Sequence, residues 1–302
     1  MSDVDVVIVA YRSRDGIDGL VQQAKAIPGV VSVVVVDNGD DDSADVAHKA
    51  GAVTLRRPDN PGFGVSQNLG VALGDAPYVL LLNPDAVPAA KGIEAGVRHL
   101  RQNESVAAVQ GAIENRWTGE PERSHGVELG PAHLFGRALG LRRLIRLRPI
   151  RAVAARTALR DHVQRKVDVP TPVESMAATV LLVRRTAFES VEGFDDRYFL
   201  YGEDLDLCRR LRAAGWQLVA LPDTFAVHES GGSSAGWWDR ELSWWQGTMQ
   251  FAARWWTTPR WILGVIASLV RWAGLAVARP RHAARAWTSV VASGLSRERT
   301  SV

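Results

Sequence analysis

The sequence has little of what defines several large protein classes. Its 302 residues include one cysteine, Cys208, so no intramolecular disulfide is possible and a reducing compartment is favoured. With 27 glycines, 23% charged residues and no internal repeat, the composition excludes collagen, a coiled coil and a low-complexity disordered chain. The length suits one large α/β domain with an appendage, or two small domains.

The sequence also lacks a secretion signal and a convincing membrane span. Two acids precede the first apolar run, without a basic segment or a small-residue cleavage site, so we expect no signal peptide. The best spanning candidate, residues 261–278, has barely the length to cross hydrocarbon. Arg271 lies inside it, at a cost of about 2.5–3.5 kcal/mol. A helix in the membrane interface therefore fits better, and we expect a cytoplasmic protein.

The net charge of +3 conceals two regions of opposite sign. Residues 1–130 contain 11 Lys and Arg against 18 Asp and Glu, whereas residues 131–302 contain 25 against 15. The stretch from Arg137 to Lys166 carries ten basic residues and one acid and is interrupted by Pro149. We interpret it as two short basic amphipathic helices or a partly mobile loop. Nine of the eleven tryptophans lie within 237–287, so the composition of the C-terminal region differs from that of the rest of the chain.

The rest of the chain alternates buried-strand patterns with helical ones. The predicted strands are 4–10, 30–36, 52–55, 78–82, 106–110, 180–183 and 217–220. The predicted helices are 16–26, 43–50, 65–73, 92–102 and 205–214. β-Branched runs between helices indicate an α/β fold with a mostly parallel central sheet flanked by helices. We divide the chain into a domain over 1–235, with a basic insert at about 137–166, and a helical Trp- and Arg-rich region over 236–302.

Polar residues terminate three of the predicted strands. They are Ala10-Tyr11-Arg12, Asp37-Asn38 and Asn83-Pro84-Asp85. Any one of them is well explained as a turn or a helix cap. Together they lie where open α/β sheets bind ligands, outside the carboxyl ends of the strands, so we predict a binding site along this edge.

Two further segments contain candidate functional residues. The loop Asn60-Pro61-Gly62-Phe63-Gly64, followed by Asn68, would let backbone amides approach a phosphate, although it is neither a dinucleotide-binding fingerprint nor a P-loop. The stretch 193–210 places five carboxylates among four aromatic residues. Of these, Glu203 and Asp204 would also suit a helix N-terminus. A lone His228 follows the last predicted strand, and such a histidine is more often structural than a ligand.

In this order, the motifs resemble those of glycosyltransferase family 2, and in particular the rhamnosyltransferases that build bacterial cell-wall linkers and polysaccharides. The matching segments are VDVVIVAYRS, VVVVDNGDDDS, NPGFGVSQNLG, LLLNPDAVP, LLVRRTAFESVEGFDDRYFLYGEDLDLCRRLRAAGW and AVHESGGSS. The resemblance implies the GT-A fold, a nucleotide-binding α/β domain whose active site lies at the sheet edge. Here it would carry a C-terminal helical extension.

The resemblance also implies a role for each motif. Asp204, paired with Glu203, would be the catalytic base. Asp85 and His228 would bind Mg²⁺ or Mn²⁺, with Asn83 replacing the first carboxylate of the family's DxD motif. Asp37 would accept a hydrogen bond from the base of the donor. The residues along the donor would be Ala10, Tyr11, Arg12, Asp37, Asn60, Gly64, Asn68, Asn83 and Asp85.

We therefore predict an inverting, metal-dependent glycosyltransferase that moves L-rhamnose from dTDP-L-rhamnose to a hydroxyl of a lipid-linked, cell-wall or polysaccharide acceptor. The alternatives are a UDP-sugar donor (galactofuranose or N-acetylhexosamine), a nucleotidyltransferase that makes sugar nucleotides, and a non-catalytic membrane scaffold. The nucleotidyltransferase would need a Gly-rich N-terminal loop, which VAYRSRDG lacks. Residues 174–179 depart from the family's Gly-containing pattern on the acceptor side, so the acceptor stays open.

The basic C-terminal half predicts a peripheral association with the inner face of the cell membrane. Nucleic acid is disfavoured, because no zinc pattern, helix-turn-helix or RNP-like strand is present. Near an anionic membrane each Lys or Arg contributes about 1 kcal/mol, and Trp is typical of the interface. A polyprenyl-diphosphate-linked acceptor would be met at this surface. The alternative is a helical hairpin packed on the catalytic domain, with its arginines solvated.

Overall fold

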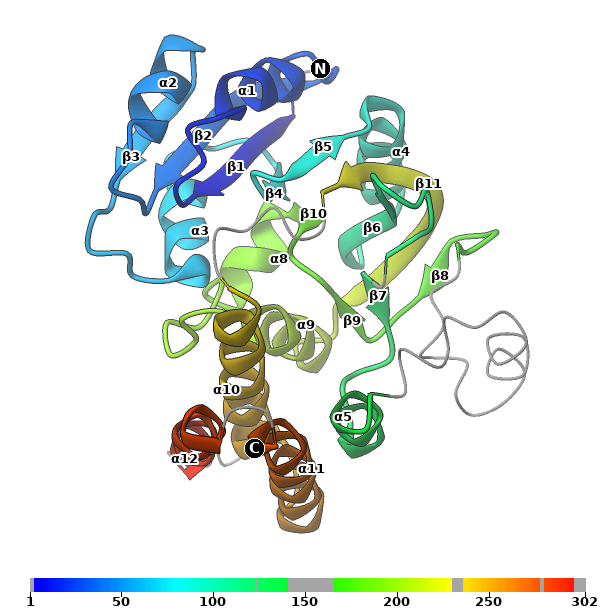
Figure 1. Cartoon of the computed structure of the whole chain (residues 1–302). Coiled ribbons are helices and arrows are strands. Elements are labelled where there is room, and N and C mark those ends of the chain that lie inside the picture. The colour runs from blue at the N-terminus through cyan, green and yellow to red at the C-terminus, as the bar shows by residue number, and fades with distance from the viewer. Residues whose placement is uncertain (1–2, 123, 141–165, 230–235, 278–279, 296–302) are drawn as a thin grey trace. The chain divides into compact units, whose positions relative to one another are not determined.

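The computed structural model describes residues 3–122, 124–140, 166–229, 236–277 and 280–295 (Figure 1). The chain forms two compact units: residues 1–126, 165–199 and 206–234 make up the first, and residues 127–164, 200–205 and 235–302 the second. Two segments that the sequence analysis placed in the first domain, 127–164 and 200–205, thus belong to the second unit. Most of the basic stretch 137–166, with the helices predicted in it, lies outside the described residues.

The first unit is built on one large sheet. Its strands, in spatial order, are β3 (Val53–Arg56), β2 (Val30–Asp37), β1 (Val4–Ala10), β4 (Tyr78–Leu82), β10 (Val180–Arg184), β6 (Val106–Asn115), β11 (Gln217–His228) and β5 (Ala86–Pro88), with β8 (Thr171–Pro172) also paired to β11. A second, two-stranded sheet pairs β7 (His125–Gly126) with β9 (Ser175–Met176).

The predicted α/β architecture is confirmed. The first four strands in spatial order run parallel, and so do β6 and β11. β10 is inserted between β4 and β6 and is antiparallel to both, and β5 is antiparallel to β11. The carboxyl ends of β1, β2 and β4 consequently share one edge of the sheet, where the sequence placed its polar residues.

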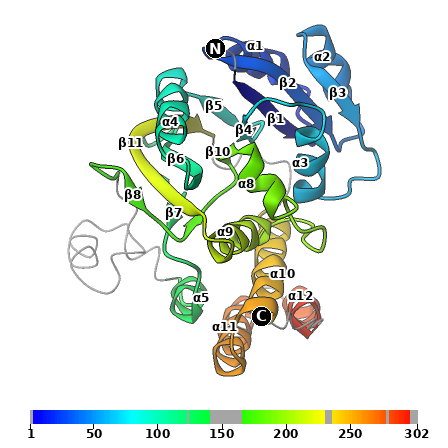
Figure 2. The ribbon, with the colours of Figure 1, turned by 180° about the vertical axis from the view of Figure 1, so that it is seen from behind.

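Helices cover both faces of this sheet (Figures 1 and 2). One face packs against α1 (Ile17–Lys25), α2 (Ser43–Lys49) and α4 (Ala90–Gln102), and the other against α3 (Phe63–Val71), α8 (Arg185–Ser190) and residues 206–213 of α9 (Glu203–Ala213). Alternate residues of a strand point to opposite faces, so in β1 Val6 and Ile8 join one apolar core while Val7 and Val9 join the other.

Most predicted elements differ from the observed ones by at most two residues at either end. The exceptions are β6 and β11, which were predicted as 106–110 and 217–220 but extend to Asn115 and His228. Their second halves pair with each other, so that His228 lies opposite Asn115. These extensions carry the strand pair out to the predicted site.

The second unit contains four helices among its described residues: α5 (Pro131–Ala138), α10 (Trp237–Trp255), α11 (Thr258–Ala276) and α12 (Pro280–Leu295). A buried carboxylate, Glu241 of α10, joins three of them. Its oxygens accept hydrogen bonds from Arg137 of α5 at 2.5 Å, from Arg271 of α11 at 2.8 Å and from Trp245 Nε1 at 3.0 Å. Burial opposes its charge, but the two arginines outweigh burial and hold the pKa of Glu241 below its usual value.

This arrangement changes the interpretation of the Trp-rich segment. Trp245, Trp256 and Trp272 are at most 4% exposed and form part of the interior rather than an aromatic surface. Arg271, which made 261–278 unsuited to span a membrane, has its charge satisfied by Glu241. No helix within the described ranges combines the length and hydropathy that crossing a bilayer requires.

Candidate active site

The structure brings Asp85 and His228 together. Asp85 follows β4 and immediately precedes β5, and His228 is the last residue of β11, where it pairs with Ala86 of β5. Asp85 Oδ1 lies 3.1 Å from His228 Nε2. The two residues predicted as metal ligands, far apart in the sequence, thus present a carboxylate oxygen and a ring nitrogen to each other.

A third residue, Glu122, completes this cluster and was not predicted. Its Oε2 lies 2.8 Å from Nδ1 of His228, on the opposite side of the ring from Asp85. Glu122 follows the turn after β6, in a segment without strand or helix periodicity. No spacing or motif in the sequence marks it, because only the pairing of β6 with β11 brings it to His228.

The two carboxylates govern the charge of His228. Burial disfavours the imidazolium, but hydrogen bonds with Asp85 and Glu122 outweigh burial and raise the pKa of His228 to about 9. Burial likewise opposes the charge of Glu122, and hydrogen bonds from His228 and Asn115 hold the pKa of Glu122 below its usual value. Over the described parts of the chain, no three His, Cys, Asp or Glu side chains are grouped so that they could hold one metal ion.

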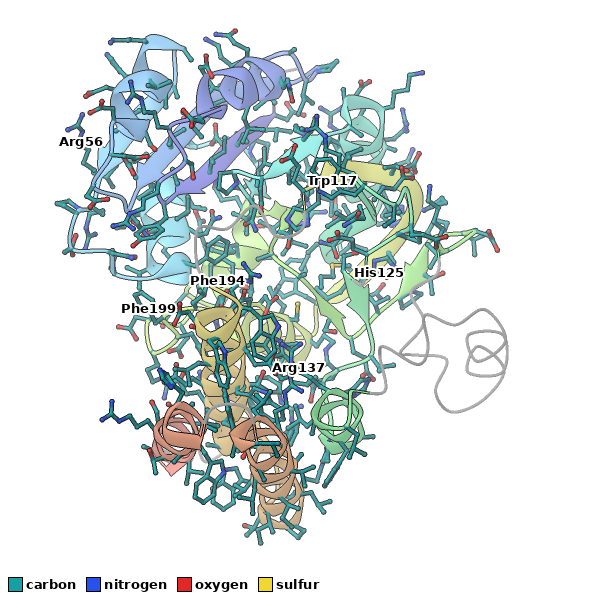
Figure 3. The ribbon with its side chains drawn as sticks, viewed as in Figure 1. Arg56, Trp117, His125, Arg137, Phe194 and Phe199 are labelled. Atoms are coloured by element: carbon teal, nitrogen blue, oxygen red, sulfur yellow. The ribbon has the colours of Figure 1, made fainter. Side chains whose placement is uncertain are left out.

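The turn after β6 is tied to this cluster. Asn115 Nδ2 donates to Glu122 Oε1 at 2.8 Å, and Asn115 Oδ1 accepts from the backbone amides of Trp117 and Thr118. The backbone amide of Arg116 donates to the carbonyl of His228. The turn carries Trp117 into solvent, where the side chain is 73% exposed (Figure 3). The turn that carries this exposed tryptophan is therefore bound through Asn115 to Glu122 and through the backbone of Arg116 to His228.

The end of β1 and the end of β2 lie side by side, as predicted from their parallel order. Ala10 pairs with Asp37 across the two strands and its carbonyl accepts from the backbone amide of Asn38. Tyr11 is 45% exposed. Arg12 adopts a positive φ of 53° and forms an ion pair with Asp40.

Asp37 is buried and already holds the following turn. Its Oδ1 accepts from the backbone amide of Gly39 and its Oδ2 from that of Ala44 near the start of α2, each at 2.9 Å. Burial dominates these hydrogen bonds and raises the pKa of Asp37 above its usual value. Asp37 thus stabilises the turn and the start of α2, as the turn-or-cap explanation supposed. The predicted contact with the base of a donor would have to use the remaining lone pairs of the same oxygens.

The glycine-containing loop packs against the segment that leads to α9. Gly62 has a φ of 98°, and a Cβ there would lie 2.6 Å from the carbonyl oxygen of Phe199, so only glycine fits. The side-chain amide of Asn68 binds the backbone of Phe194, with Nδ2 donating to the carbonyl at 2.7 Å and Oδ1 accepting from the amide at 2.9 Å. Gly62 and Asn68 therefore stabilise the packing of this loop, and the contact of Asn68 with a donor stays a prediction.

The other predicted donor residues are placed as follows. Asn60 has a positive φ of 41° and begins the turn at Gly62, and Gly64 is buried in the first turn of α3. Asn83 follows β4 directly, its backbone amide donating to the carbonyl of Thr179 at 2.8 Å. Its side-chain Oδ1 is buried and accepts no hydrogen bond from the described chain.

Glu203 and Asp204 open α9, as the sequence suggested, and belong to the second unit. Tyr201 and Gly202, with φ of 66° and 90°, turn the chain into the helix. Asp204 is half-buried and its Oδ1 accepts from the amide of Leu205. Glu203 is 5% exposed, and burial together with the neighbouring Asp204 raises the pKa of Glu203 well above its usual value. Asp204 is thus the better candidate for a base, and that role stays a prediction.

Comparison with known proteins gives a family match over most of the chain. The model of the family described as "Glycosyltransferase like family 2" matches residues 2–257. The N-acetylglucosaminyl-diphospho-decaprenol L-rhamnosyltransferase of Mycobacterium tuberculosis (strain ATCC 25618 / H37Rv) is 48% identical over 63 residues, which are 21% of this chain and 20% of that protein. Rhamnosyltransferase WbbL of Escherichia coli (strain K12) is 36% identical over 85 residues, 28% of this chain and 32% of that protein.

The matched segments thus span about a fifth to a third of these curated relatives. Among solved structures, the mannosyltransferase PcManGT from Pyrobaculum calidifontis, in complex with GDP-Man and Mn²⁺, is similar with a TM-score of 0.56. The two sequences are 14% identical, and the alignment covers 98% of this chain and 88% of that one. This likeness supports the GT-A fold.

The burial of Glu203 predicts an unusual dependence of stability on pH. The unfolded chain ionises Glu203 near pH 4.5, while the folded protein keeps it protonated to higher pH, so its contribution to stability falls as the pH rises between the two pKa values. Glu203→Gln should therefore raise the free energy of unfolding at pH 7.5 and change it little at pH 4. Each unit of difference between the folded and unfolded pKa values corresponds to about 1.4 kcal/mol of this effect at the higher pH. Urea denaturation at both pH values measures this. The exposed Glu104→Gln serves as control, and equal effects of the two substitutions at pH 7.5 would contradict the assignment.

Proposed function

The chain belongs to glycosyltransferase family 2, and on that premise we propose that it transfers L-rhamnose from dTDP-L-rhamnose to a hydroxyl of a lipid-linked, cell-wall or polysaccharide acceptor. The observation that carries the proposal is the meeting of Asp85 and His228 at the carboxyl end of β4, where open α/β sheets bind their ligands. Rhamnose is suggested by two partial relatives that are named as rhamnosyltransferases. A UDP-sugar donor is the alternative within the same chemistry.

Two residues of this cluster, Asp85 and His228, fit a hard divalent cation. Bonds to Mg²⁺ are about 2.1 Å long in an octahedron, so adjacent ligand atoms lie about 3 Å apart. Asp85 Oδ1 and His228 Nε2, at 3.1 Å, have this spacing. Asp85 and His228 would hold the ion, and an imidazole ligand suits Mn²⁺ better than Mg²⁺. The ion would neutralise the charge that develops on the departing nucleoside diphosphate.

The protein's own part in the reaction is orientation and proton removal. The acceptor hydroxyl is a weak nucleophile and needs a base, the role we assign to the half-buried Asp204, while the buried Glu203 stays protonated beside it. In a single displacement with Asp204 as the base, the hydroxyl gives its proton to Asp204 and attacks the anomeric carbon in line, and the diphosphate leaves on the other face. The stereochemistry at the anomeric carbon is inverted.

The experiment that tests the donor and the metal is a thermal-shift series. The wild-type protein is mixed with dTDP-L-rhamnose, UDP-galactofuranose, UDP-N-acetylglucosamine or GDP-mannose, with and without Mn²⁺. We expect the largest rise in Tm with dTDP-L-rhamnose plus Mn²⁺, and a loss of the Mn²⁺-dependent part in Asp85→Asn and His228→Ala. A larger response to a UDP-sugar would replace the donor, and no Mn²⁺-dependent response in the wild type would contradict the metal site.

The assignment of the base predicts a separation of binding from turnover. Asp204→Asn removes the proton acceptor but keeps the side-chain volume, so kcat should fall by at least about 100-fold while dTDP affinity changes less than twofold. Transfer is followed with radiolabelled donor and a polyprenyl-diphosphate-linked glycan acceptor, and dTDP affinity by calorimetry. Asp196→Asn, an exposed acid of the same acidic segment, is the control. More than a few per cent of residual activity in Asp204→Asn would exclude it as the base.

We further propose that the helical region 236–302 attaches the enzyme to an anionic membrane surface. The support comes from five aliphatic side chains on α11 that are each 37–46% exposed: Ile262, Leu263, Ile266, Leu269 and Val270. Between Arg260 and Arg271 the helix has no charged residue, and Arg271 is only 18% exposed because it pairs with Glu241. This outward face is therefore apolar, within a region of positive net charge, as expected of an interfacial helix.

Membrane attachment through α11 is tested by vesicle flotation. Ile266→Glu combined with Leu269→Glu should reduce flotation with phosphatidylglycerol vesicles at least tenfold, because two charges would enter the lipid interface. The matched control is Val31→Glu combined with Val53→Glu, two valines of similar exposure in the first unit. Unchanged Tm values establish that both proteins are folded. Wild-type flotation by the α11 variant would contradict the proposal.

A further inference from the structure

Glu122 is held at both carboxylate oxygens. Oε1 accepts from Asn115 Nδ2 and Oε2 lies on His228 Nδ1, each at 2.8 Å. The backbone amide of Glu122 donates to the carbonyl of Ile113 at 2.7 Å, which fixes the residue alongside β6. The side chain is 22% exposed, so little of it remains available to solvent. Such a carboxylate has one orientation, and that orientation is toward the imidazole.

The position of Glu122 excludes it as a ligand of the same ion as Asp85. Asp85 faces Nε2 of the ring and Glu122 faces Nδ1, so the two carboxylates lie on opposite sides of the imidazole. A neutral imidazole carries its proton on one nitrogen and its lone pair on the other. A carboxylate that accepts from Nδ1–H therefore leaves the lone pair of Nε2 directed to the side of Asp85.

We propose that Glu122 is a positioning residue for His228: it fixes the tautomer and the ring plane in which Nε2, together with Asp85, binds the divalent cation. The inference rests on the metal site of the proposed function. A metal-bound histidine commonly donates its second ring N–H to a carboxylate, which orients the ring and increases its basicity. Asn115 extends the arrangement, since it holds Glu122 and also pairs with His228 between β6 and β11.

The direct measurement is Mn²⁺ affinity, read from the loss of the free-ion signal in electron paramagnetic resonance as protein is added. Glu122→Ala should weaken Mn²⁺ binding by about 10- to 100-fold. Glu122→Gln keeps an oxygen that can accept from Nδ1–H, so its affinity should lie closer to that of the wild type than to that of Glu122→Ala. Glu120→Ala removes an exposed acid from the same turn and should leave the affinity unchanged.

A second set of variants separates positioning from a general structural effect. In a His228→Ala background, Glu122→Ala should change Mn²⁺ affinity by less than about twofold, because Glu122 acts only through the imidazole. An undiminished loss in that background would overturn the proposal, as would wild-type affinity of Glu122→Ala alone. If Asp85→Asn and His228→Ala themselves bind Mn²⁺ like the wild type, the metal site of the proposed function fails, and with it the role of Glu122.

Discussion

The pairing of β11 with two neighbours is the constraint on which the candidate site depends. The second half of β11 runs parallel to β6 and antiparallel to β5, so His228 lies opposite both Asn115 and Ala86. Asp85 precedes Ala86, and Asn115 holds Glu122. Because the side chains of a strand alternate between faces, a slip of one residue would turn His228 away from both carboxylates. The register of a single strand thus assembles the cluster.

In each unit, ion pairs between partly or fully buried side chains determine which groups are left at the surface. In the first unit Glu122 and Asp85 hold His228 at a sheet edge. In the second, Glu241 draws Arg137 and Arg271 inward, which leaves α11 with an uncharged outer face. A buried carboxylate is costly unless it is paired and hydrogen-bonded, so both arrangements bind several elements together. The proposed catalytic and membrane roles therefore follow from the same physical requirement.

Several residues of the family-like motifs serve the scaffold. Asp37 holds the turn into α2, Asn68 clamps the backbone of Phe194, and Gly62 makes room for Phe199. The resemblance implied donor contacts for Asp37 and Asn68, and neither role excludes the other, since a carboxylate or amide oxygen has more than one lone pair. A motif in such a fold preserves the geometry of the loops as well as the groups that touch the ligand.

The sequence by itself determined the α/β class, the order of the strands along the chain and most element boundaries, because apolar periodicity and turn residues are local properties. Through its motifs it also named Asp85 and His228. Only the tertiary structure decided that these two residues meet, that β10 is inserted antiparallel between β4 and β6, that Glu122 supports His228, and that Arg271 points to Glu241. Each of these depends on strand register or helix packing between segments far apart in the sequence, and local patterns do not encode which distant partner a side chain will meet.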